Sequence, residues 1–267
     1  MKNVIKTFIK TKPRLYDVVT RVCQFLFLRK DDTYEFFDNF SKAHGRRVTF
    51  LQVGASDGLR WDPIRSFIVR DAWDGILVEP LPSVFDLLQS NYRYVKKSKL
   101  VFVNAAVSSL GAETLSFWTF DDTFLSKLSL EERVIYSQKS SFSKEHVLRW
   151  IRLNKHPEGI LREIRVPCFT LGEIVRRYWD GHPIELLVID AEGHEASIIE
   201  GIDFESINPE AIYFESHNLA AKKKDVYDFL SQNNYKVIEI GGDSVALRNA
   251  SDLADRLQLK PRTAARC

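Results

Sequence analysis

Short apolar runs rich in β-branched residues alternate with longer amphipathic segments from Val48 onward. This alternation is typical of strand–helix–strand units and of a mostly parallel sheet with helices on both faces. It predicts an α/β protein of the doubly wound kind. Seven strands are expected, at Val48–Val53, Gly75–Glu79, Leu100–Val107, Ile184–Asp190, Ala211–Glu215, Tyr235–Gly241 and Ser244–Arg248.

The last two predicted strands are separated only by Gly242 and Asp243. Two residues are too few for a crossover between parallel strands, so these strands must form an antiparallel hairpin. The sheet of a dinucleotide dehydrogenase ordinarily continues in parallel, so the hairpin counts against that class.

Two helices carry start signals. Pro82 suits a first helical turn, and Val84, Leu88 and Tyr92 follow it at a spacing of three to four residues. Thr170 followed by Glu173 predicts a capping box at the start of the helix before the fourth strand.

The segment between Val107 and Ile184 is longer than a simple crossover requires, so we expect a cap insertion there. We place the cap at about 121–163. The whole segment carries a strand at Thr114–Phe120, a partly helical stretch at Ser129–Leu153 and an extended Val166–Phe169. The expected organisation is a helical arm over 1–47, a catalytic domain over 48–250 and a tail over 251–267.

The 38 basic and 36 acidic residues leave a formal net charge of +2, so no broad positive field favours a nucleic-acid partner. Cys23, Cys168 and Cys267 are too few and too scattered for a disulfide framework or a CxxC metal site. This cysteine usage suits a reducing cytosol, and we expect a cytoplasmic protein.

The amino-terminal arm is basic and carries one apolar stretch, Val22–Leu28. This stretch is far shorter than the roughly 20 residues needed to span a bilayer, so no integral membrane segment is expected there. A helix packed on the domain is the favoured interpretation. A weak membrane-surface contact by the arm and a homo-oligomer both stay open.

A tight turn, Gly54-Ala55-Ser56-Asp57-Gly58, follows the first predicted strand. Ligands bind at the carboxyl edge of the sheet in doubly wound folds, and glycine lets the backbone pass close to a ligand. We expect Asp57 to hydrogen-bond a ligand ammonium group. The turn lacks the GxGxxG spacing of a dinucleotide fingerprint, which argues against NAD.

The second and third predicted strands end in further candidates for a nucleoside site. Glu79-Pro80 ends the second strand, where a carboxylate can accept hydrogen bonds from both ribose hydroxyl groups. Asn104-Ala105-Ala106-Val107 ends the third strand, where an adenine ring would lie.

Several of these segments, taken in order, resemble the FkbM-type methyltransferases. The resemblance implies a class I, Rossmann-like fold, S-adenosylmethionine as the cofactor, and O-methylation of sugars, glycans or secondary metabolites. One departure is Gln52, a candidate cofactor contact at a position where many relatives carry an acidic residue. The matching segments are Val53-Gly-Ala-Ser-Asp-Gly58, Asp62-Pro-Ile64, Val78-Glu-Pro80, Asn104-Ala-Ala-Val107, Val166-Pro-Cys-Phe-Thr-Leu171, Ile189-Asp-Ala-Glu-Gly-His-Glu195 and Phe214-Glu-Ser-His217.

Acidic residues and histidines follow the fourth and fifth predicted strands. Asp190 ends one strand, and Glu215 and His217 end its neighbour, so these side chains should lie within reach of one another. They are the candidates for a general base. A divalent cation on Asp190 and Glu215 is the alternative, which we do not favour because the rim offers histidines and no tight set of ligands.

Residues after Asp190 and in the cap are candidates for binding the acceptor. Glu192 and His194 lie where a helix begins; this position also suits a residue that only complements the helix dipole. The FkbM-type proteins that the chain resembles carry similar serine–phenylalanine stretches followed by a histidine, which implies that Ser141, Phe142 and His146 close over cofactor or acceptor, with His146 a further candidate base. The alternative is a polar helix cap with His146 in solvent.

Two other classes of function remain. A nucleotide-binding oxidoreductase would use Glu79, but the broken fingerprint and the terminal hairpin count against it. A non-catalytic binding module could keep the fold and the cofactor site without turnover.

Overall fold

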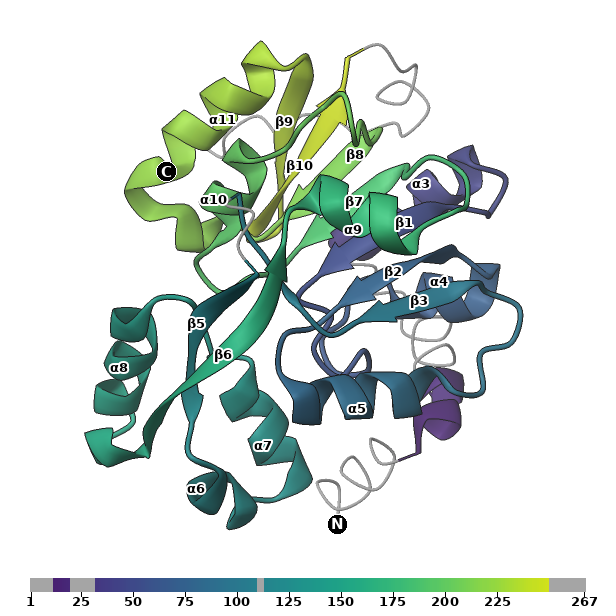
Figure 1. The fold of residues 1–267 in the computed structure, drawn as a ribbon. Helices are drawn as coiled ribbons and strands as arrows, with labels where there is room; N and C mark the ends of the chain where they lie inside the picture. Colours follow the sequence, from purple (N-terminus) through teal and green to yellow (C-terminus); the bar gives the residue numbers. More distant parts are fainter. Residues whose placement is uncertain (1–11, 20–31, 110–112, 250–267) are drawn as a thin grey trace, which may run out of the picture.

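A seven-stranded sheet forms the centre of the protein (Figure 1). The computed structural model describes residues 12–19, 32–109 and 113–249. The strand order is β3-β2-β1-β7-β8-β10-β9. The strands are β1 (Thr49–Val53), β2 (Asp74–Val78), β3 (Leu100–Val103), β7 (Leu186–Ile189), β8 (Ala211–Phe214), β9 (Tyr235–Ile240) and β10 (Asp243–Arg248).

Six of these strands run in the same direction, and β10 alone runs antiparallel to its two neighbours. β1 lies between β2 and β7, with Val53 opposite both Val78 and Ile189. β10 is inserted antiparallel between β8 and β9. The predicted hairpin and the mostly parallel sheet are therefore confirmed, and the fold is a doubly wound α/β fold. In doubly wound folds ligands bind at the carboxyl ends of the strands where the strand order reverses, and here these are the ends of β1 and β7.

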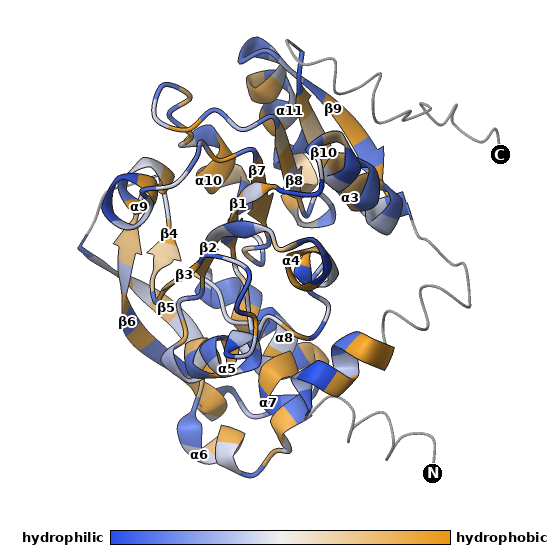
Figure 2. Ribbon diagram, turned by 90° about the vertical axis from the view of Figure 1, so that its right-hand side faces the viewer, coloured by the Kyte–Doolittle hydropathy of each residue, from blue (hydrophilic) through white to orange (hydrophobic). Residues whose placement is uncertain are grey.

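β1, β7 and β8 are buried throughout because helices cover both faces of the sheet. On one face, α9 (Leu171–Tyr178), α10 (Glu195–Glu200) and α11 (Lys223–Gln232) pack their apolar sides on the strands. On the other face lie α3 (Asp32–Ala43), α4 (Arg65–Asp71) and α5 (Pro82–Tyr92). In Figure 2 the central strands are mostly hydrophobic, whereas α4 and α9 carry both hydrophobic and hydrophilic residues.

The predicted strand at Leu100–Val107 is wrong as a single element. β3 ends at Val103, and β4 (Ala106–Val107) joins a second sheet of order β4-β6-β5. The break occurs at Asn104, whose side-chain amide donates to the backbone carbonyls of Glu79 (2.8 Å) and Pro80 (3.1 Å). These bonds turn the chain away from the main sheet.

The long insertion forms a lobe beside the main sheet (Figure 1). β5 (Thr114–Phe120) pairs antiparallel with β6 (Leu161–Phe169), so the expected strand at Thr114–Phe120 is confirmed. Along the chain, three α-helices separate these two strands: α6 (Asp122–Ser126), α7 (Leu130–Ser137) and α8 (Lys144–Leu153). Phe120, Val147, Ile151 and Ile160 form the small apolar core of the lobe. The cap therefore includes both strands of this sheet and spans residues 113–169.

The capping box predicted at Thr170 is present, with reciprocal bonds between Thr170 and Glu173. A second capping box, of Ser129 and Glu132, begins α7. Of the arm, the structure describes a helix over 13–19 and α3, which packs three phenylalanines into the core. Val22–Leu28, Cys23, Cys267 and the tail lie outside the described residues. No helix within residues 12–19, 32–109 and 113–249 is long and apolar enough to cross a membrane.

Candidate active site

The turn after β1 is held against the two neighbouring strands. The backbone N–H groups of Gly54 and Ala55 both donate to the carbonyl of Val78 on β2, at 3.0 Å. Gly54 has a φ of +77°, and a Cβ on it would lie 1.7 Å from the backbone oxygen of Asp190 on the β7 side. Only glycine fits a position that combines this φ with so close an approach.

Asp57 takes a different role from the one expected for it. Its carboxylate accepts hydrogen bonds from the backbone of Leu59 and Arg60 (3.0 Å each) and pairs with the Arg60 guanidinium. Asp57 is fully buried and does not line the cavity described below. It therefore stabilises the turn from within.

Gln52 is also buried behind the turn. Its side-chain nitrogen approaches the carboxylate of Asp62 at 3.4 Å. Asp62 is half-buried, and desolvation raises its pKa. An acidic residue at position 52 would place a second carboxylate beside Asp62, which gives a physical reason for the amide found here.

Glu79 lies at the carboxyl end of β2, beside the turn. One of its oxygens accepts from the backbone N–H of Ser56 (3.0 Å) and the other from that of Leu81 (2.9 Å). Glu79 is 6% exposed, and burial raises its pKa to about 7, with the charges of Asp190 and Asp57 adding to the shift. Each oxygen keeps a lone pair for another donor.

A cavity that is partly open to solvent lies above these strand ends, between the main sheet and the cap, with about 660 Å³ of empty space. The main domain contributes Val53, Gly54, Ser56, Glu79, Pro80, Leu81, Val84, Ala105, Ala106, Val107, Asp190, Ala191, Glu192 and Ile198. The cap contributes Phe117, Ser137, Gln138, Ser140 and Phe142.

The cavity gathers some of the residues expected at the site and leaves others outside. Of the candidates expected from the sequence, it brings together Gly54, Glu79, Pro80, Ala105, Ala106, Phe142, Asp190 and Glu192. It is not lined by Gln52, Ala55, Asp57, Gly58, Asn104, Ser141, His146, His194, Glu215 or His217. Sequence reasoning missed Ser56, Phe117, Ser137, Gln138 and Ser140. Ser56 lies inside the recognised turn, whereas the cap residues carry no local signal.

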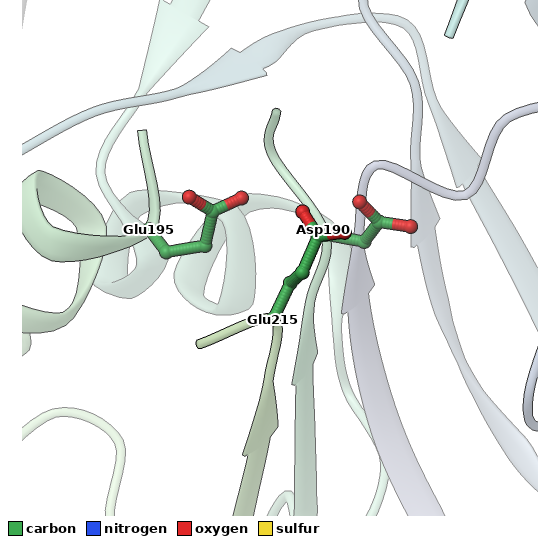
Figure 3. A group of neighbouring side chains, drawn as sticks. All are labelled: Asp190, Glu195 and Glu215. Atoms are coloured by element: carbon green, nitrogen blue, oxygen red, sulfur yellow. The ribbon is translucent and has the colours of Figure 1, made fainter. Parts of the chain in front are cut away.

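Three carboxylates meet at the ends of β7 and β8 (Figure 3). Asp190, Glu195 and Glu215 each offer one oxygen, and these oxygens lie within 4.8 Å of one another. Glu195 is fully buried and accepts hydrogen bonds from the backbone of Ala191 (2.8 Å) and Gly193 (3.0 Å). It thereby fixes the loop that follows Asp190.

Desolvation, with neighbouring negative charge adding to it, raises the pKa of these three carboxyl groups. Asp190 keeps part of its surface exposed to solvent, and desolvation by the surrounding protein, followed by the charges of Glu215 and Glu192, raises its pKa to about 7. Burial, followed by Glu192 and Glu195, raises the pKa of Glu215 to about 7. The pKa of Glu195 is also about 7, chiefly because of burial. Groups with such a pKa exchange protons readily at neutral pH.

The cap holds the loop after Asp190 through Glu192. The carboxylate of Glu192 pairs with Lys139 (2.6 Å) and lies 3.8 Å from His146. Its backbone carbonyl accepts from the hydroxyl of Ser141 at 3.1 Å. Glu192 has a φ of +45°, so these contacts hold a residue in a backbone conformation that residues other than glycine rarely adopt.

The histidines lie around this site rather than in it. The His194 ring packs on Phe142 with centroids 4.6 Å apart, and burial lowers its pKa. Burial also lowers the pKa of His146. His217 is exposed and its Nε2 lies 3.2 Å from Glu215, so the expected Glu215–His217 pair is present.

A family model described as the methyltransferase FkbM domain matches residues 52–237. No curated protein matches the chain.

Several solved structures are similar to the chain. Monomeric WbdD is 10% identical with a TM-score of 0.41, over 80% of this chain and 39% of WbdD. The Methanococcus jannaschii fibrillarin pre-rRNA processing protein is 9% identical with a TM-score of 0.41, over 77% and 68%. Precorrin-6y C5,15-methyltransferase from Geobacter metallireducens GS-15 is 11% identical with a TM-score of 0.36, over 76% and 80%. The chain thus spans 39% of the length of WbdD.

Proposed function

The chain belongs to the FkbM methyltransferase family, and from this we propose that it transfers a methyl group from S-adenosylmethionine to a hydroxyl group of a sugar, glycan or secondary metabolite. The matched residues include the turn at Gly54, the carboxylate of Glu79 and the acidic cluster. The observation that carries the proposal is that Gly54, Glu79 and Asp190 line a single cavity.

The residues of the cavity fit this cofactor. The carboxylate of Glu79 keeps lone pairs that two ribose hydroxyls can use. The walls next to it are apolar and include Leu81, Val107 and Ile198, which suits an adenine ring and a methionine chain. The hydroxyl of Ser56 is buried at the cavity with no hydrogen-bond partner among the described residues. A polar ligand would satisfy this orphaned group.

When bound, S-adenosylmethionine supplies the methyl group as a sulfonium electrophile. The protein's own contribution is to orient the acceptor and to remove its proton. Asp190 is the candidate base because it lines the cavity and is ionised above a pH of about 7. Glu215, paired with His217, lies next to Asp190 and is the second candidate for holding that proton.

A cation already accompanies the carboxylates. Lys139 pairs with Glu192, and its charge lowers the pKa values of Asp190 and Glu215 against the larger effects that raise them. This lysine supplies positive charge at the site, so we favour deprotonation without a metal ion. A divalent cation on Asp190, Glu195 and Glu215 is the alternative.

The cap closes the other side of the cavity. Phe117 and Phe142 present edge-to-face rings with centroids 5.2 Å apart. Together with Ser137, Gln138 and Ser140 they reduce the access of water and give the acceptor both an apolar surface and polar partners.

Transfer of a labelled methyl group tests the proposal. The protein is incubated with S-adenosylmethionine labelled on the methyl group and with matched acceptors that carry a hydroxyl, an amine or a thiol. We expect label on the hydroxyl acceptors, with the rate rising through a pH of about 7. Label on amines alone would contradict O-methylation, and no transfer despite cofactor binding would favour the non-catalytic module.

A further inference from the structure

We propose that Asp17 is a positioning residue for the cofactor turn and that it acts through Arg65. Asp17 belongs to the helix over 13–19, whereas the residues matched by the family model begin at 52. The inference rests on the proposed function in one respect, namely that the turn after β1 binds S-adenosylmethionine. The coupling of Asp17 to that turn stands on contacts alone.

Arg65, the first residue of α4, joins the arm to the turn. Its Nε donates to one oxygen of Asp17 at 2.9 Å, and one terminal nitrogen donates to the other oxygen at 3.3 Å. The second terminal nitrogen donates to the backbone carbonyl of Gly58, the last residue of the turn. Arg65 is 2% exposed and Asp17 is 8% exposed, so this ion pair is almost completely buried.

Other groups close the network around the guanidinium. It donates to the hydroxyl of Tyr94 (2.8 Å) and to the carbonyl of Asn91 (3.1 Å), and it stacks over the ring of Tyr92. The Tyr94 hydroxyl in turn donates to Asp17. The amide of Asn91 donates to the carbonyl of Asp57 at 2.8 Å, which supports the turn at a second point.

Asp17 is the carboxylate that pairs with the Arg65 side chain. Asp62 lies nearby, but its Oδ1 accepts from the backbone N–H of Arg65, at 3.1 Å. A buried guanidinium that loses its carboxylate is strongly destabilised, and it gains by turning towards water. Such a movement would take the hydrogen bond away from Gly58. The turn would then sample other conformations and bind the cofactor less tightly.

The variant Asp17→Asn tests the coupling because it keeps the shape of the side chain and removes its charge. Asp38→Asn is the matched control. Asp38 is also a buried acid of the arm and pairs with Arg70 of α4 at 2.8 Å, but among the described residues the hydrogen bonds of Arg70 go to Asp38, Asp71 and Tyr34 and not to the turn. Asp17→Glu, which keeps the charge, is the conservative comparison.

Two readouts are measured, the Kd for S-adenosylmethionine by calorimetry and the hydrogen exchange of residues 54–60 without ligand. We expect Asp17→Asn to raise Kd roughly three- to thirtyfold, as is typical of residues coupled to a site that they do not touch. The KM for the acceptor should stay constant. Exchange in the turn should become faster in Asp17→Asn and stay unchanged in Asp38→Asn, and Asp17→Glu should retain most of the affinity.

An unchanged Kd and unchanged exchange in folded Asp17→Asn would overturn the inference and leave the proposed function intact. If the unmodified protein does not bind S-adenosylmethionine, the proposed function fails, and the exchange measurement alone decides the coupling. If Asp17→Asn does not fold, Tyr94→Phe provides the milder test, because it removes one hydroxyl from the same network. Equal exchange in the turn of that variant would also overturn the inference.

Discussion

The backbone oxygen of Asp190 lies 1.7 Å from the position that a Cβ on Gly54 would occupy. The end of β7, which carries the candidate base, is therefore in direct backbone contact with the turn that we assign to the cofactor. This contact fixes the relative position of the two halves of the site. The packing of the turn on the end of β7 therefore requires glycine at position 54, because a larger side chain would collide with the neighbouring strand before it reached a ligand.

We expect Gly54→Ala to be severely destabilising, because the added methyl group would force β1 and β7 apart and would also strain a φ of +77°. Gly45→Ala is the control, since Gly45 has a φ of +61° and nothing within 4 Å of an added Cβ. Thermal unfolding should show a small loss for Gly45→Ala and little folded protein for Gly54→Ala. Equal melting temperatures would show that the contact between the strands is not rigid.

Asp190→Asn should lower turnover about a hundred- to ten-thousandfold, the usual contribution of a positioned base, while changing cofactor affinity much less. In the unmodified protein the rate should rise as pH passes about 7, because the raised pKa of Asp190 leaves it protonated below that point. The rate of Asp190→Asn should lack this rise. If the pH–rate profile of Asp190→Asn still rises near pH 7, the general base is not Asp190, and Glu215 and His217 become the candidates.

A chelator distinguishes the two forms of this mechanism. Without a metal, activity should be indifferent to chelation; a divalent ion on Asp190, Glu195 and Glu215 would make activity disappear on chelation and return with magnesium or manganese.

The fold was predictable where local physics decides it. β7 and β8 are continuous apolar runs because both faces of the sheet are covered, and the capping box of Thr170 and Glu173 is readable from a spacing of three residues. The break at Asn104 was not predictable, since the run Leu100–Val107 is apolar on both sides of it. The cause is tertiary: the Asn104 amide binds carbonyls about 25 residues earlier in the chain.

The site was predictable at the strand ends and not in the cap. Glu79 and Asp190 end apolar strands, so topology alone places them at one edge of the sheet. The pairing of Lys139 with Glu192 joins residues 53 positions apart and depends on how the cap folds back. The interpretation of Asp57 as a ligand contact missed Arg60 three residues later, which takes up its charge.

We expect Lys139→Met to remove the ion pair between the cap and Glu192 and to remove positive charge beside Asp190 and Glu215. Because Lys139 lowers the pKa of both carboxyl groups, its loss should shift the rising limb of the rate profile to higher pH. Lys139→Arg should restore the limb, and Lys127→Met, at an exposed cap position, is the control. An unshifted limb in Lys139→Met would show that the lysine has no electrostatic role.

Glu195 makes the stability of the protein depend on pH. Burial raises its pKa from the ordinary value of 4.5 to about 7, so between these values the native state binds more protons than the unfolded state. Its contribution therefore becomes less favourable as pH rises from 4.5 to 7. Melting temperatures of Glu195→Gln should depend less steeply on pH over this range than those of the unmodified protein and of the exposed-site control Glu205→Gln. Parallel curves for all three would rule out this role of Glu195.

The most direct test of S-adenosylmethionine binding at Glu79 is calorimetric titration of the unmodified protein and of Glu79→Ala, each with S-adenosylmethionine and with NAD. We expect saturable one-site binding of S-adenosylmethionine to the unmodified protein and no binding of NAD. Glu79→Ala should bind about 1.5 to 3 kcal/mol more weakly, the range for hydrogen bonds to a charged group. The exposed-site variant Asp86→Ala on α5 should bind like the unmodified protein. Binding of NAD would contradict the assignment of S-adenosylmethionine as the cofactor, and an affinity for S-adenosylmethionine that does not depend on Glu79 would contradict the role of Glu79.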